Sequence, residues 1–134
     1  MAHPYVVKAV EDYLAAKWSR APVYQSNEES EAPSDGTPFV IVQYPLSRTR
    51  RLAVESRYYQ EDGAARFVIH VERGSGTDLA LEWGDELATL FRDRNLGGGL
   101  KTQVPDSPFL DDNNDRGSYY AAAVVVPYTY DFVG

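Results

Sequence analysis

The chain has 134 residues, no cysteine, and 20 acidic against 13 basic side chains, which gives a formal net charge of -7. This length suits one hydrophobic core, so we expect a single domain over residues 1–134. The acidic balance argues against broad binding to nucleic-acid phosphates, the lack of cysteine excludes disulfides and thiolate metal sites, and no stretch approaches the ~20 apolar residues of a membrane span.

The first predicted element is an amphipathic helix near the N-terminus. Pro4 suits the first helical position, and apolar residues from Val6 to Trp18 recur at helical spacing. The helix should end near Pro22. Residues 26–38 are polar and rich in turn formers, which predicts a loop.

A strand and a β-hairpin are predicted next. Residues 39–44 are β-branched and aromatic on both faces, which is typical of a central strand. Residues 51–59 and 65–72 are then predicted as the two arms of a hairpin. Its turn is placed at residues 60–63, because the Asp62-Gly63 pair can supply the positive φ of a tight turn. His70 falls on the mixed face of the second arm, where we expect a surface or interface residue.

The second helix is predicted from Thr77, which can cap it, to Arg94. Its acids precede its terminal arginines, and this order complements the helix dipole. The apolar stripe expected to face the core consists of Leu79, Trp83, Leu87, Leu90 and Phe91. Leu81 and Ala88 lie outside this stripe, so we expect them to touch a neighbouring subunit.

The C-terminal region is predicted to return to the sheet. Residues 97–99 should end the helix, residues 100–104 form a short strand, and residues 105–117 form a second polar loop. The last strand begins near Ser118, and Pro127 indicates an edge or a bulge because proline lacks a backbone donor. The inward side chains of this strand are predicted to be Tyr120, Val124, Val126, Tyr128 and Tyr130. The fold class is therefore α+β: a single antiparallel sheet, mixed at most, with a β-hairpin and two helices packed against it.

The sequence contains no persuasive catalytic or metal-binding motif. His70 lacks a signalled partner and is a weak candidate for a general base. The acidic run 111–117 resembles a calcium loop, but Arg116 stands at the sixth position, which needs glycine, and Ala122 at the twelfth, which needs glutamate. We therefore predict no catalytic residue, no metal and no cofactor.

A cluster of arginines stands out in this acidic chain. Arg48, Arg50, Arg51 and Arg57 lie within ten residues of one another. They either form a solvated hairpin stem or contact the acidic surface of an adjacent subunit, where charge pairing would guide assembly. The acids suggested for that surface are Glu28, Glu29, Glu31, Asp111, Asp112 and Asp115. Together with Leu81, Ala88 and Pro127, the four arginines form the predicted subunit interface.

Two stretches carry a resemblance to a known family. Residues 76–78 lead into 83–87 and 90–92, and residues 117–120 lead into 126–128. In this order, they resemble the tail terminator-like proteins of long-tailed bacteriophages, the family that includes the lambda minor tail protein U. The preceding strand at 39–44 and hairpin at 58–71 fit the family's order of elements, so the similarity spans most of the chain.

The resemblance implies a structural role in the virion. Such proteins form a ring, usually a hexamer, on the last ring of the tail tube, stop tube growth and offer the surface for head-tail joining. The implied partners are other copies of the chain, the tail tube protein and a connector or stopper protein, with no membrane and no specific DNA binding although DNA passes through the ring. We expect assembly in the bacterial cytoplasm and a final place at the neck end of the tail. Two alternatives stay open: another neck or tube component of the same particle, and a small-molecule enzyme.

Overall fold

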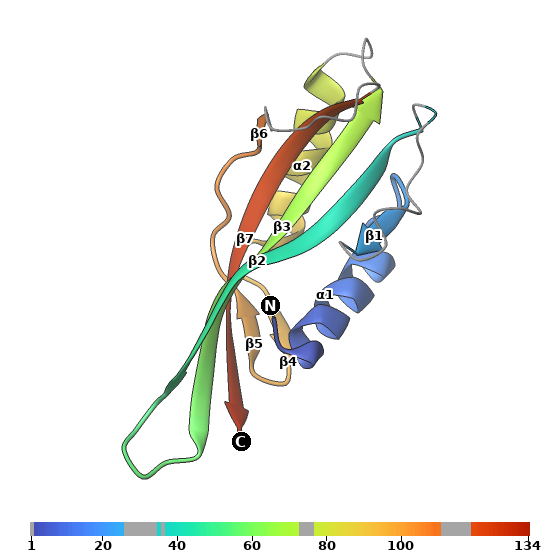
Figure 1. Ribbon diagram of the computed structural model, residues 1–134. Helices are drawn as coiled ribbons and strands as arrows, with labels where there is room; N and C mark the ends of the chain where they lie inside the picture. The colour runs from blue at the N-terminus through green and yellow to red at the C-terminus, as the bar shows by residue number, and fades with distance from the viewer. Residues whose placement is uncertain (1, 26–34, 36, 73–76, 111–118) are drawn as a thin grey trace.

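The computed structural model describes residues 2–25, 35, 37–72, 77–110 and 119–134. Within these residues, two helices and a curled, mixed sheet form the fold (Figure 1). The elements in chain order are α1 (Pro4–Lys17), β1 (Val23–Gln25), β2 (Phe39–Arg51), β3 (Tyr58–Glu72), α2 (Thr77–Phe91), β4 (Asn95–Gly97), β5 (Leu100–Thr102), β6 (Phe109–Leu110) and β7 (Tyr119–Val133). The α+β class is confirmed.

The sheet is mixed rather than purely antiparallel. Its strand order is β1-β2-β3-β7-β5-β4, and β6 pairs separately with β7. The short β1 runs parallel to β2, whereas every other pairing among the described strands is antiparallel. β1 had no sequence signal of its own, because three residues are too few to show an alternating pattern.

The main core lies between one face of the sheet and the two helices. Val6, Val10 and Leu14 of α1 are buried, as the helical spacing predicted. They join alternate residues of the central strands, such as Phe67 and Val124, in one apolar cluster. The opposite face is buried too, where Phe39, Ile41 and Tyr119 form a second cluster.

This second cluster corrects the prediction for His70. The imidazole is 5% exposed, stacks on Phe39 with ring centroids 4.5 Å apart, and meets Tyr119 edge-on at 6.0 Å. His70 is thus a buried residue rather than a surface residue, because both faces of the sheet are covered at this end. Tyr120, predicted to point inward, is instead 39% exposed.

The hairpin turn lies elsewhere than predicted. β2 and β3 pair from Phe39↔His70 to Arg51↔Tyr59, with one register shift between Gln43 and Leu46, and residues 52–57 form the turn. The chain closes there with hydrogen bonds from Leu52 N to Tyr58 O at 3.0 Å and from Ser56 N to Ala53 O at 3.2 Å. Gly63 lies inside β3 for a different reason: a Cβ there would stand 2.5 Å from Tyr128 Oη and 2.6 Å from the Leu46 carbonyl oxygen. The glycine permits close packing, and the Asp-Gly pair was misread as a turn.

The glycine triplet also differs from its prediction. α2 ends at Phe91. Gly97 is the last residue of β4, and Gly98 and Gly99 form the turn to β5; the φ values of the three glycines are 88°, 61° and 92°. These left-handed angles favour glycine.

The core stripe of α2 is rotated from its predicted position. The buried residues are Ala80, Trp83, Leu87, Ala88 and Phe91, whereas Leu79 and Leu90 are only half-buried. Ala88 is 1% exposed and therefore belongs to the core, not to a surface that a neighbour could touch. The small side chains of Ala80 and Ala88 carried too little hydrophobic signal to centre the stripe correctly.

Candidate assembly surface

The β2–β3 hairpin extends beyond the helices as an arm, which we define as residues 46–64 (Figure 1). β2 is buried from Phe39 to Val42 and mostly exposed from Pro45 to Arg51, so one strand belongs partly to the core and partly to the arm. β7 supports the arm on the other side of β3, with pairs that continue to Tyr58↔Val133. Three paired strands thus hold the arm away from the rest of the protein.

The four predicted arginines all lie on this arm. Arg48 and Arg50 share one face of β2, because both are an even number of residues from Leu46. Arg51 lies on the other face, with its guanidinium 6.0 Å from the centroid of the Tyr59 ring. Arg57 sits in the turn region, and its Nε donates to the carbonyl oxygen of Gly134 at 2.7 Å.

Arg50 is part of an exposed polar row across the three strands. Its guanidinium donates to Gln60 Oε1 at 2.7 Å and lies 3.6 Å from the Asp62 carboxylate. Gln60 in turn donates to Asp131 Oδ1 at 2.8 Å. Exposed pairs of this kind contribute little to stability, so these groups can exchange partners at low cost.

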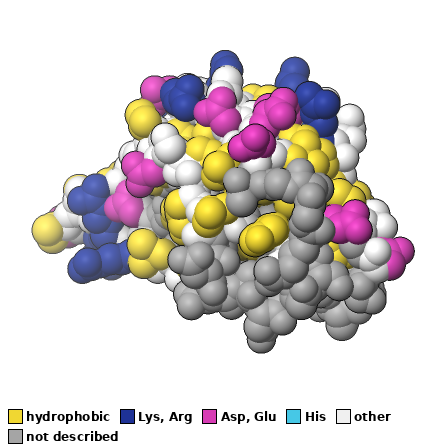
Figure 2. All heavy atoms as spheres, turned by 90° about the horizontal axis from the view of Figure 1, so that it is seen from above, with side chains coloured by type: hydrophobic (Ala, Val, Ile, Leu, Met, Phe, Trp, Pro, Cys, Tyr) yellow, Lys and Arg dark blue, Asp and Glu magenta, His cyan; other side chains and the backbone are white. Residues whose placement is uncertain are grey.

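Large apolar side chains are exposed on the arm and beside it. Val54 in the turn is 88% exposed, and the others are Leu46, Leu52, Tyr58 and the adjacent Val133. Figure 2 shows hydrophobic and basic side chains together on the part of the molecule that projects to the left. Exposed apolar groups among charged ones are typical of protein-protein contact sites.

The outer part of the arm, which we define as residues 48–60, concentrates positive charge. It contains four arginines and one acid, Glu55, which gives +3, whereas the whole arm carries +1 because Glu61 and Asp62 lie at its base. The rest of the chain therefore carries -7 - 3 = -10. Within one protein, a basic projection and an acidic remainder are complementary between copies.

The base of the arm is joined to the start of α1 by a buried carboxylate. Glu61 is 5% exposed, and its Oε2 accepts from Tyr128 Oη at 2.6 Å and from the His3 backbone N–H at 3.2 Å. His3 also caps α1, since its Nδ1 accepts from Tyr5 N at 3.1 Å. Burial raises the pKa of Tyr128, and the hydrogen bond to Glu61 raises it further, so the phenol remains a donor.

A ladder of aromatic rings flanks this carboxylate. The His3 ring lies 5.0 Å from Tyr130 and 5.2 Å from Phe132. Tyr5 stacks on Tyr130 at 5.2 Å, and Phe132 stacks on Tyr59 at 5.7 Å. The aromatic residues thus connect the first turn of α1 with the inner face of the arm.

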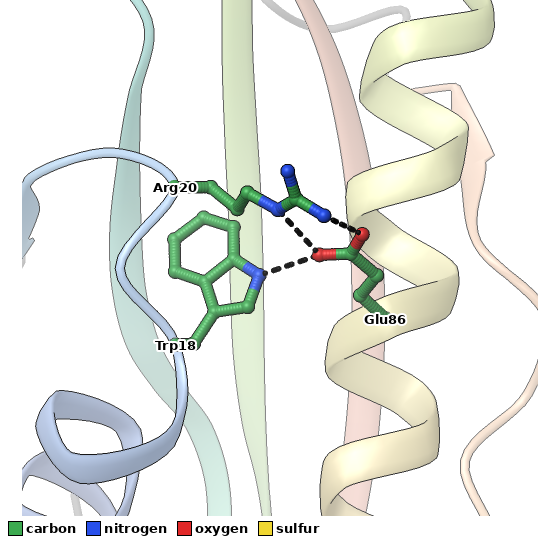
Figure 3. A network of polar contacts seen from close by, with 3 residues as sticks. All are labelled: Trp18, Arg20 and Glu86. Carbon is green, nitrogen blue, oxygen red and sulfur yellow. Dashed lines mark hydrogen bonds and ion pairs between the residues drawn. The ribbon is translucent and has the colours of Figure 1, made fainter.

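A second polar contact joins the end of α1 to α2 (Figure 3). Arg20 donates to both oxygens of Glu86, at 3.1 Å and 2.9 Å, and Trp18 Nε1 donates to Oε1 at 3.2 Å. The hydrogen bond to Glu86, followed by its negative charge, raises the pKa of Arg20. This network was not predicted, because Glu86 lies more than 60 positions from Trp18 and Arg20 in the sequence.

The remaining predicted interface residues fall in different environments. Leu81 is half-buried against the core. Pro127 lies within β7, paired with Ala64, and its carbonyl oxygen accepts from Gln103 N at 2.8 Å just beyond the end of β5. The edge that Pro127 predicted is therefore confined to the side of β7 that faces β5, at the point where β5 ends. Glu28, Glu29, Glu31, Asp111, Asp112 and Asp115 lie outside the described residues, as do residues 111–117 of the calcium-like run.

Among the described residues, the surface has grooves, but reactive side chains do not cluster in one place. A groove of about 600 Å³ runs along α1, lined by residues that include Tyr5, Tyr13 and Leu96. Among the described residues, no cluster of three or more His, Asp or Glu side chains is placed to hold a metal. No described helix is long and apolar enough to span a membrane.

Comparisons with known proteins identify the family. A family model described as "Phage tail terminator protein" matches residues 5–128. No curated protein matches the chain. A solved structure superimposes with a TM-score of 0.57 at 22% identity, covering 100% of this chain and 99% of the other, and this likeness shows the fold alone. The closer relation to the lambda minor tail protein U remains a prediction. With residues 5–128 matched, the chain belongs to the phage tail terminator family, whose members are structural components of phage tails.

Proposed function

We propose that this protein is the tail terminator of a long-tailed bacteriophage. In this role, copies of the chain form a ring, expected to be a hexamer, on the end of the tail tube. The ring stops tube polymerisation and presents the surface for head-tail joining. The observation that carries the proposal is the family match over residues 5–128, which includes both helices and most of β7.

The arm is the proposed element of self-association. It projects from the rest of the fold, it exposes Leu52 and Val54, and its outer part carries +3 against -10 elsewhere. An arm on one side of a subunit and an acidic receiving surface on another make a heterologous contact, which closes into a ring when the rotation between subunits allows it. Charge pairing would guide the encounter, and the apolar side chains would add affinity.

The proposed partners follow from this position in the particle. The tail tube protein would contact one face of the ring and a connector or stopper protein the other. The acids predicted for contacts with the tube, the connector or the lumen, Glu28, Glu29, Glu31, Asp111, Asp112 and Asp115, keep that proposed role. The protein would be assembled in the host cytoplasm and end as a virion component at the neck, and the role requires no catalytic residue.

Electron microscopy of purified tail tubes tests the proposal. Tubes mixed with the protein should show added density at one end only. A neck protein that binds elsewhere would leave tube ends bare, and a second tube component would be incorporated along the length. Either outcome would contradict the terminator role.

A charge-reversed arm tests the proposed self-association in the same assay. Arg50→Glu with Arg51→Glu should leave the monomer folded, because both side chains are exposed, but should abolish the density at the tube end. The control is Arg92→Glu with Lys101→Glu, which makes the same change in net charge at exposed positions outside the arm. If both double variants cap tubes equally well, the arm arginines do not guide assembly.

A further inference from the structure

The groove that runs along α1, which we call the α1 groove, has walls that are fixed by contacts inside the protein. The hydroxyl of Tyr13 donates to the Leu90 carbonyl oxygen at 2.9 Å, and its ring meets Phe91 edge-on at 5.2 Å. Tyr5 stacks on Tyr130 with ring centroids 5.2 Å apart. Because both tyrosines are held in this way, the groove is formed before anything binds to it.

The lining of the α1 groove is mainly apolar, with one charge of each sign. Pro4, Ala9 and Leu96 complete the apolar part, and Lys8 and Asp12 are the charged residues. Lys8 Nζ lies 3.2 Å from the Asp12 carboxylate, and both side chains are exposed. An exposed pair four residues apart on a helix contributes little to stability, so each of these groups can take another partner at low cost.

The turn of the arm has a matching composition over residues 51–55, which we call the tip. Leu52 and Val54 are exposed apolar side chains. Arg51 precedes them and Glu55 follows them, and both are exposed. The tip is therefore an apolar pair with a base at one end and an acid at the other.

The charges of the tip and of the groove fit in one orientation. Arg51 can pair with Asp12 while Glu55 pairs with Lys8, and the apolar side chains between them then enter the groove. The reverse orientation would bring like charges together, which is unfavourable. A groove of about 600 Å³ has room for two aliphatic side chains.

The arm cannot fill the groove of its own chain. Strands advance ~3.3 Å per residue, so the tip stands roughly 20 Å beyond Leu46, where the arm begins. The pairing among β2, β3 and β7 holds the arm in a direction that leads away from α1 (Figure 1). An occupant from this chain must therefore come from a second copy, and because tip and groove are different surfaces, such a contact is heterologous.

We propose that the tip of the arm docks in the α1 groove of a second copy. In this contact, Arg51 faces Asp12 at one end of the groove. Glu55 faces Lys8 at the other end. The inference rests on the proposed function, since it identifies the receiving site for the arm in the ring, and each copy gives one tip and receives one.

Cysteine cross-linking on capped tail tubes tests the contact. The chain has no cysteine, so Val54→Cys in the tip and Ala9→Cys in the groove place one thiol in each of two proteins. The two proteins are mixed, added to tubes and oxidised, and an affinity tag on one of them gives the heterodimer its own mass. A disulfide needs Cβ atoms about 3.5–4.5 Å apart, so a heterodimer reports that tip and groove touch. We expect this heterodimer.

The matched control replaces the thiol in the groove by one elsewhere. Thr89 is exposed on α2 and lies outside the α1 groove. A mixture of Val54→Cys with Thr89→Cys should therefore give no heterodimer under the same conditions. Equal yields from the two mixtures would mean that the cross-link forms by random collision, and the contact would be overturned.

A charge exchange tests the orientation of the tip. Lys8→Glu, added to the Ala9→Cys protein, places two acids together and should lower the heterodimer yield by roughly two- to fivefold. Glu55→Lys, added to the Val54→Cys protein, should restore the yield in that mixture. Both positions are exposed, so circular dichroism should show unchanged folding. A yield that Lys8→Glu leaves unaltered would contradict the proposed orientation.

The outcomes separate this contact from the terminator role. Capped tubes without heterodimer would overturn the contact and leave the proposed function intact. Coupling of a photoreactive group on Ala9→Cys to the tube subunit, in place of another copy, would also overturn it. If the mixture does not cap tubes, concentrated free protein is oxidised instead: heterodimer there would uphold the contact, and its absence would overturn it.

Discussion

Gly63 shows how one residue without a side chain determines the packing at the base of the arm. Tyr128 and the Leu46 carbonyl both approach it more closely than any Cβ would allow. The sequence pattern Asp-Gly marked this position as special but assigned the wrong cause, since a turn and a close approach favour the same residue.

Replacement of Gly63 by alanine should therefore lower the free energy of unfolding, although it adds only one methyl group. The new Cβ would displace Tyr128 from Glu61, and overpacking of this kind costs about 1–3 kcal/mol. Urea denaturation should show the loss, whereas Thr49→Ala on the exposed part of the same hairpin should change little. A Gly63→Ala protein as stable as its parent would contradict the packing described here.

At the scale of elements, α1 and the residues that follow it contact α2 through both apolar and polar side chains. Apolar contacts include the edge-on pair of Trp18 and Trp83, with centroids 5.8 Å apart. The polar contact is the Glu86 carboxylate, which accepts from both Trp18 and Arg20. Trp18 is 7% exposed, so its indole N–H depends on this acceptor.

Glu86→Ala should destabilise the protein through the indole group. An unsatisfied buried donor costs about 1–3 kcal/mol, and the change should appear as a lower unfolding temperature. Glu82→Ala is the matched control, because Glu82 is an exposed acid one turn earlier on the same helix. Equal unfolding temperatures for the two variants would show that Trp18 does not need Glu86.

Patterns of apolar residues in the sequence predicted the parts of the elements that are buried in the core. The start of the first helix was placed correctly because Val6, Val10 and Leu14 lie on one face and proline marks the first turn, whereas the helix ends at Lys17, before the predicted end near Pro22. The strand at 39–44 was recognised from its unbroken apolar run, and its exposed continuation to Arg51 was missed. That continuation is held by pairing with β3 rather than by burial, so its sequence carries no hydrophobic pattern.

The candidate site was predictable only in part. The arginines were singled out from their spacing, and the structure places all four on the arm. The contacts among Glu61, Tyr128 and His3 join positions up to 67 residues apart, and a lone glutamate in a polar stretch gives no sign of burial. Such a group becomes visible only when the fold brings its donors together.

For the whole molecule, the separation of charge is the main feature relevant to assembly. The outer part of the arm carries +3 and the rest of the chain -10, and in the proposed ring this difference would favour contacts that bring the arm of one copy to an acidic surface of the next. The arm's exposed apolar residues stand within the basic part of that pattern. This arrangement suits a subunit that meets copies of itself at a fixed place, such as the end of a tube.

The most direct measurement is tube elongation in the presence of the protein. Purified tube subunits are added to preformed tubes, with and without this protein, and tube lengths are measured by electron microscopy over time. A terminator should stop growth at the capped end, so lengths should stay constant while untreated tubes lengthen. Continued growth of tubes that carry the protein at that end would contradict the account.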